Sequence, residues 1–124
     1  MSLRLRSDFW VAALLRRAEA AGAYVTIARR GAAEAGAIFV AVHRQGDQCD
    51  LYGPAPQSVF DVEHPSERLF LKAADGVTAA ELRERIDREI RFDPDVWLVD
   101  IEDRDGRPFV ELVSESAGAG FTDR

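Results

Sequence analysis

Residues 23–52 read AYVTIARRGAAEAGAIFVAVHRQGDQCDLY, and this stretch decides the fold class. Residues 23–30 are rich in β-branched side chains and alternate, with Val25 and Ile27 on one face and Tyr24 and Thr26 on the other, a pattern that is typical of a β-strand. Small, turn-prone residues follow, and then a second run (37–44) and a short third run (49–52) are joined by a Gly-Asp turn. Because strands joined by short loops usually pair antiparallel, the stretch predicts a meander.

A helix is predicted before these strands, over residues 8–21. Ser7 is a good N-cap, the apolar residues recur at helical spacing, and Gly22 ends the helix. Leu14 lies on the apolar face, so we expect it in the core.

A second helix is predicted after the strands. Thr78 and Glu81 form a capping box, and the helix continues to about Phe92 before Pro94 stops it. Its apolar face places Ile86 in the core.

Three further strands are predicted over residues 68–73, 96–101 and 109–113, and the last two form a hairpin through Asp105-Gly106. Val99 is expected in the core. The element order is therefore α-β-β-β-β-α-β-β. It predicts an α+β fold, an antiparallel sheet of five to six strands with two helices on one face. Residues 1–113 form a single domain in this interpretation, and residues 114–124 form a disordered tail.

Composition limits the functional classes. The chain has 124 residues and a single cysteine, Cys49, so we expect one domain without an internal disulfide, as in a reducing compartment. The longest apolar run, residues 9–15, is too short to span a bilayer, and a pI near 4.9 argues against nucleic acid. We expect a cytoplasmic protein without a membrane or nucleic-acid partner, and no motif indicates a cofactor.

Charge is uneven along the chain. Residues 1–44 carry seven Arg and three acids, a net +4, and residues 45–124 carry a net −10. The basic half either neutralises the acidic half within the fold or forms an exposed face for an acidic protein partner. The candidate residues of such a face are two arginine pairs, Arg16, Arg17, Arg29 and Arg30.

The candidate catalytic residues are scattered. His43 alternates with apolar residues on the second strand, whereas His64 lies beside Glu63 in the proline-rich loop 53–67. A carboxylate–imidazole pair there can perform acid–base chemistry. Cys49 is a nucleophile only if a base lies close to it, and the sequence places none there. For each of these residues the favoured interpretation is a structural or solvated role.

Acidic residues are densest between positions 93 and 105. Asp100 and Glu102 share a strand face and form a two-carboxylate candidate site for Mg²⁺ or Ca²⁺. The stretch lacks the ligand spacing of a calcium loop, so a solvated strand edge and turn is favoured and no metal is predicted.

Two functional hypotheses remain open. The apolar second face of the strands and the missing catalytic constellation favour a non-enzymatic protein-interaction module that self-associates as a homodimer. The alternative is a small enzyme or ligand-binding protein with a site under loop 53–67, whose Val59 and Phe60 would cover the second face. A pocket that joins His43 or His64 to a carboxylate would favour this alternative.

Three segments resemble a known family: residues 4–11 (RLRSDFWV), 51–54 (LYGP) and 95–103 (DVWLVDIED). The family comprises short alphaproteobacterial proteins that are catalogued as a domain of unknown function, and the resemblance covers the chain to about Val113. It implies no activity, cofactor or catalytic residue, and it favours a cytoplasmic, bacterial origin.

Overall fold

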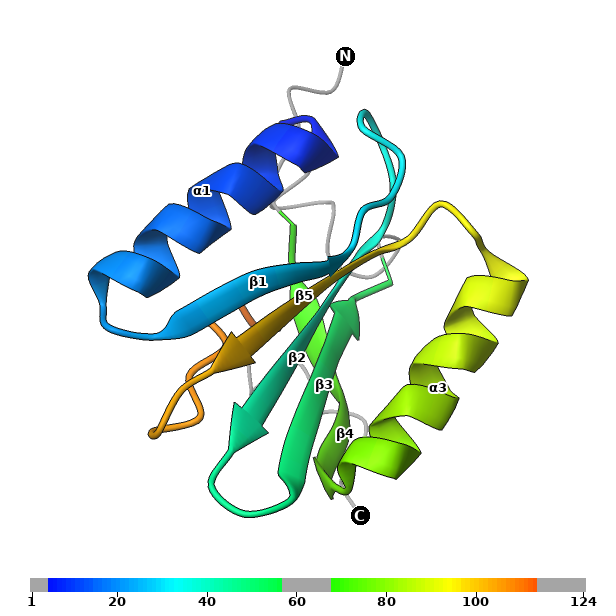
Figure 1. Ribbon diagram of the computed structural model, residues 1–124. Helices are drawn as coiled ribbons and strands as arrows, with labels where there is room; N and C mark the ends of the chain where they lie inside the picture. Colours follow the sequence, from blue (N-terminus) through cyan, green and yellow to red (C-terminus); the bar gives the residue numbers. More distant parts are fainter. Residues whose placement is uncertain (1–4, 57–67, 114–124) are drawn as a thin grey trace.

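The computed structural model describes residues 5–56 and 68–113. Within these residues, two helices and five strands occur in the order α-β-β-β-β-α-β, which confirms the α+β class and all but the last predicted element (Figure 1). In chain order these are α1 (Ser7–Ala20), β1 (Tyr24–Arg29), β2 (Ile38–Arg44), β3 (Gln48–Pro54), β4 (Phe70–Val77), α3 (Ala79–Phe92) and β5 (Trp97–Glu102).

The sheet is mixed, so the prediction of a purely antiparallel sheet is wrong. Its strand order is β1-β5-β2-β3-β4, and β5 lies parallel to β2 while the other neighbours are antiparallel. The meander is therefore limited to β2, β3 and β4, since β5 separates β1 from β2. The parallel pairing of β5 with β2 arises from α3. This helix carries the chain back across the sheet so that β5 runs in the same direction as β4, as in a β-α-β crossover.

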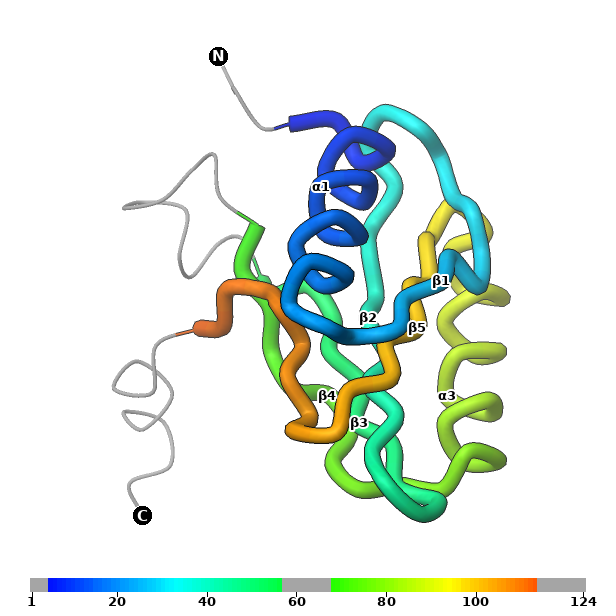
Figure 2. The backbone as a smooth tube through the Cα atoms, turned by 60° about the vertical axis from the view of Figure 1, so that its left-hand side comes forward, coloured from blue at the N-terminus to red at the C-terminus, as the bar shows by residue number. Residues whose placement is uncertain are grey.

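The two helices lie on opposite faces of the sheet, which corrects the prediction that they share one face (Figure 2). Leu14 of α1 packs in one core cluster with Val99 of β5, whereas Ile86 of α3 packs with Phe39 and Leu51 in the other cluster. All three predicted core residues are buried. The apolar second face of β2 and β5 is therefore explained by α3 within the same chain.

Residues 109–113 do not form the predicted last strand. Only an isolated bridge between Phe70 and Leu112 occurs there, and Phe109 adopts a positive φ of 60°. A hairpin with β5 is impossible because β1 and β2 already occupy both edges of β5. The segment instead packs Phe109 and Val110 against the α1 core cluster.

The start of α1 also differs from the prediction. Arg6 occupies the N-cap position, while Ser7 is fully buried and its hydroxyl donates to the Gly36 carbonyl at 2.7 Å. Ser7 thus connects α1 to the loop between β1 and β2 rather than capping the helix. The capping box of α3, between Thr78 and Glu81, is confirmed.

Candidate functional site

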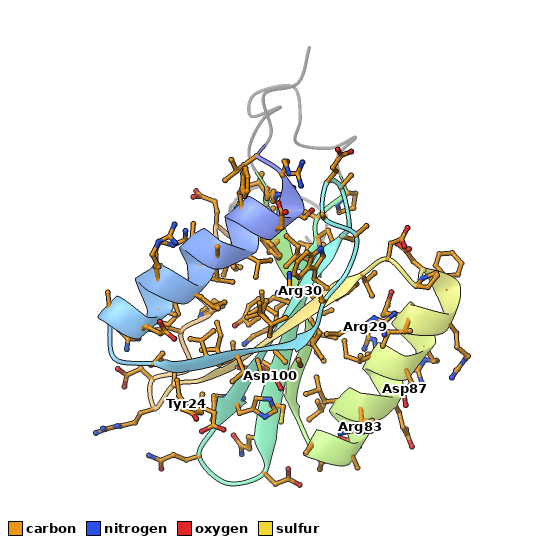
Figure 3. The ribbon with its side chains drawn as sticks, turned by 45° about the horizontal axis from the view of Figure 1, so that its top comes forward. Tyr24, Arg29, Arg30, Arg83, Asp87 and Asp100 are labelled. Carbon is orange, nitrogen blue, oxygen red and sulfur yellow. The ribbon has the colours of Figure 1, made fainter. Side chains whose placement is uncertain are left out.

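A groove lies where α3 leaves part of the sheet uncovered. The helix contacts β3 and β4, whereas the side chains of Tyr24, Thr26 and Ala28 on the distant strand β1 are exposed. Between the helix and the uncovered strands is a hollow of about 340 Å³. In Figure 3, Arg29 and Asp100 lie on the sheet side of this groove, and Arg83 and Asp87 extend from α3.

Aliphatic side chains form much of the groove. Leu82, Ile86 and Ile90 face it from α3, one turn apart along the helix, and Leu98 and Ala28 face it from β5 and β1. The buried faces of Leu82 and Ile86 also belong to the core, so this wall is held rigidly. The groove therefore offers an apolar surface that is anchored in the fold.

His43 is the central polar side chain of the groove. Its Nε2 lies 3.4 Å from Asp100 Oδ1, and its Nδ1 lies 3.4 Å from the Sγ of Cys49. The antiparallel register sets His43 opposite Cys49, and the parallel pairing of β2 with β5 brings Asp100 alongside. The sequence-predicted candidates His43, Asp100 and Cys49 thus converge.

Electrostatics of this trio favour a positioned imidazole over a reactive thiol. The hydrogen bond with Asp100 raises the pKa of His43 above 6.5, against the opposing effect of burial. Burial, and next the negative charge of Asp47, raises the pKa of the Cys49 thiol. Cys49 is only 2% exposed and stays protonated, so it serves as a partner of the His43 ring and not as a nucleophile.

Arg29 supplies a second polar element, at the end of β1. Its Nη2 donates to the Pro94 carbonyl at 2.8 Å, which fixes the guanidinium beside α3. Its Nε is buried and, among the described residues, has no hydrogen-bond partner. A buried donor without an acceptor is costly, but an atom enclosed by the protein cannot be reached by a ligand in the groove.

The other basic candidates do not form one face. Arg17 donates to the Phe109 carbonyl at 3.0 Å, and the Arg30 guanidinium lies 5.3 Å from the Trp97 ring centroid. Arg16 is exposed on α1. Since Arg29 lies in the groove, the two predicted arginine pairs are distributed over different parts of the molecule, and the acidic-partner hypothesis stays a prediction.

Only residues 53–56 of loop 53–67 are described, and the loop candidates His64, Glu63, Val59 and Phe60 lie outside the described residues. A second hollow of about 140 Å³ is bordered by Pro54 and Ala55 at one end of the loop and by Leu69 and Phe70 near the other. The hypothesis of a site under the loop stays a prediction.

The described part of the chain contains no group of three or more His, Cys, Asp or Glu side chains arranged to hold a metal ion. Glu102 is exposed at the end of β5, and Asp100 is directed to His43. Within the same residues, neither helix has the length and apolar character needed to cross a membrane.

The pairing of His43 with Cys49 could have been predicted from the sequence. His43 and Cys49 are equidistant from Gly46, so a tight hairpin centred on that glycine sets them opposite each other. Asp100 carries no such signal, because its place depends on the insertion of β5 between β1 and β2. The groove itself depends on which face α3 covers.

Known proteins share this fold and sequence. The crystal structure of a DUF1491 family protein from Caulobacter crescentus is 38% identical, with a TM-score of 0.74 over 90% of this chain and 100% of that chain. The solution structure of a protein from A. tumefaciens is 41% identical, with a TM-score of 0.78 over 91% of this chain and 98% of that chain. No curated protein matches. The family model described as "Protein of unknown function (DUF1491)" matches residues 5–111, which confirms the resemblance noted in the sequence. The chain therefore belongs to the DUF1491 family, whose members have no assigned function.

Proposed function

We propose that this protein is a binding module and that a small molecule with an apolar body and a polar end occupies the groove between α3 and the sheet. The groove volume of about 340 Å³ lies within the range of about 300–1,000 Å³ typical of small-molecule sites. Such sites combine apolar walls with fixed polar groups. This groove has both, because six apolar residues and five polar or charged residues line it.

The observation that carries the proposal is the His43–Asp100 pair on the floor of an apolar groove. A pocket that joins a histidine to a carboxylate supports the ligand-binding hypothesis drawn from the sequence, although at a different place from loop 53–67. Binding is favoured over catalysis because the Cys49 thiol is buried, and burial raises its pKa and so disfavours the thiolate.

A substitution that fills the groove tests this proposal. Ala28 is exposed and borders the groove, so Ala28→Phe should block it without disturbing the core. The uncharged probe octanol should shift the backbone amide resonances of Leu98 and Ile86 in the wild type. In Ala28→Phe its affinity should fall by about tenfold or more, which corresponds to about 1.4 kcal/mol.

The matched control is Ala12→Phe, which makes the same substitution at an exposed position of α1, on the other face of the sheet from the groove. Octanol should bind this variant as it binds the wild type. Equal affinity for wild type and Ala28→Phe, or shifts confined to residues away from the groove, would contradict the proposal.

Self-association is a second candidate property, and the free edge of β1 supports it. β1 has a sheet neighbour on one side only, and its Tyr24 is 69% exposed. A twofold pairing of β1 strands centred on Thr26 would set Tyr24 opposite Ala28 of the partner subunit, a large residue against a small one. No like charges would face each other in this register. The ring of Tyr24 would border the groove of the partner subunit.

Sedimentation equilibrium at micromolar concentration tests the dimer. We expect a mass of twice the 13.7 kDa of the chain, and Thr26→Lys should restore the single-chain mass because two like charges would meet at the axis. Leu71→Lys places the same charge on the opposite edge strand, β4, and should leave the dimer intact. A monomeric wild type, or dissociation by Leu71→Lys alone, would refute pairing through β1.

A further inference from the structure

We infer that the polar end of the ligand is a singly charged carboxylate held by Arg29 and Arg83. This inference rests on the proposed binding function and names the chemical class of its ligand. Both guanidinium groups belong to the groove, one from the end of β1 and one from α3 (Figure 3). An apolar body along Ile86 and Leu98 would place the charged end of the ligand between them.

Arg29 is positioned at the groove before any ligand arrives. Its Nη2 donates to the Pro94 carbonyl, which fixes the plane of the guanidinium. Its Nε is buried, so the terminal Nη1 is the nitrogen that remains for a ligand. A carboxylate accepts hydrogen bonds from neighbouring guanidinium nitrogens with good geometry, and such charge-assisted bonds are about twice as strong as neutral ones.

Neither Arg29 nor Arg83 forms an ion pair in the described part of the chain. Three other arginines of the described chain have carboxylate partners: Arg6 with Asp8, Arg44 with Asp50 and Arg107 with Asp103. The two groove arginines therefore keep their charge available for a ligand.

The charges of the groove match a monoanion. Asp100 is balanced by the His43 imidazole when that ring is protonated, and Asp87 offsets one of the two arginines. One positive charge is left, which suits a carboxylate better than a doubly charged phosphate. A ligand with a cationic end would face the fixed guanidinium of Arg29 and is disfavoured.

Three probes with the same alkyl chain test the inference: octanoate, octanol and octylammonium. Their affinities are measured by titration of the backbone amide resonances of the full chain. Octanoate should bind about tenfold more tightly than the other two, and the difference should decrease with added salt.

Arg83→Ala should reduce the affinity for octanoate by about threefold to tenfold and leave the affinity for octanol unchanged. Arg29→Lys keeps the charge but removes the planar guanidinium that Pro94 orients, and it should weaken the binding of octanoate as well. The matched control is Arg88→Ala, which removes the same charge from the exposed part of α3 outside the groove and should change neither affinity.

The outcomes separate the two claims. If octanol shifts the groove resonances and octanoate binds no more tightly, the carboxylate inference is wrong and the binding function stands. Tighter binding of octylammonium, or equal effects of Arg83→Ala and Arg88→Ala, would also overturn the inference. If none of the three probes shifts the groove resonances, both the inference and the proposed function fail.

Discussion

At the residue scale, the imidazole of His43 lies between Asp100 and Cys49. The hydrogen bond with Asp100 favours the protonated ring and raises its pKa, whereas partial burial opposes this rise. A folded-state pKa above 6.5 means that the His43–Asp100 pair stabilises the fold fully below the unfolded pKa. That contribution is lost as the pH rises through the raised folded-state pKa.

Asp100→Asn tests this account. Loss of the carboxylate should lower the pKa of His43, because the hydrogen bond with Asp100 is the largest cause that raises it and burial then acts with less opposition. An NMR titration of the ring proton resonances measures the shift, and the second imidazole of the chain, His64, is the internal reference. An unchanged or higher pKa of His43 in the variant would show that Asp100 does not control the ring.

At the element scale, local sequence patterns predicted most of the helices and strands correctly. They did not predict which strands lie next to each other in the sheet. The capping box of α3 and the glycine after α1 depend only on adjacent residues, and both are present. The apolar residues in positions 96–101 correctly indicate a strand, and the second face of β5 is partly buried. They do not reveal that β5 lies between β1 and β2, because that pairing joins segments far apart in the sequence. The predicted hairpin failed for the same reason.

The acidic stretch at the end of β5 is not simply solvated, because Asp103 is buried and paired with Arg107. Asp103 is 7% exposed, and its carboxylate accepts from Arg107 Nη2 at 2.8 Å and from Arg107 Nε at 3.0 Å. The guanidinium also reaches the Ala21 carbonyl at 3.4 Å, so the pair connects the segment after β5 to the end of α1. The hydrogen bond from Arg107 lowers the pKa of Asp103 to about 2.

Arg107→Gln should therefore change the response to acid. A depressed folded-state pKa gives stability that is present above the ordinary value of 3.8 and is lost as the pH falls toward about 2. The variant should be less stable at neutral pH and should lose less stability over that acidic interval than the wild type. Urea unfolding at a series of pH values measures both effects. Arg104→Gln, at an exposed neighbouring position, should follow the wild type, and identical pH profiles for all three proteins would refute the role of the pair.

At the scale of the whole molecule, the groove exists because each face of the sheet has one helix and α3 does not reach β1. The sequence predicted both helices and the apolar faces of the strands. It could not assign each helix to a face, since an apolar strand surface is compatible with a helix, a loop or a second chain above it. The interpretation of the second face as a dimer surface followed from that ambiguity. With α3 covering Phe39 and Leu51, the surface left over is the groove.

The most direct test of the account is the position of a bound probe. Nuclear Overhauser effects between the alkyl chain of octanoate and methyl groups of the wild-type protein report which side chains the probe contacts. The account predicts cross-peaks to Ile86, Ile90 and Leu98, which border the groove from α3 and β5. Cross-peaks confined to exposed apolar residues elsewhere, such as Leu5 and Leu112, would contradict it, as would their complete absence at saturating probe.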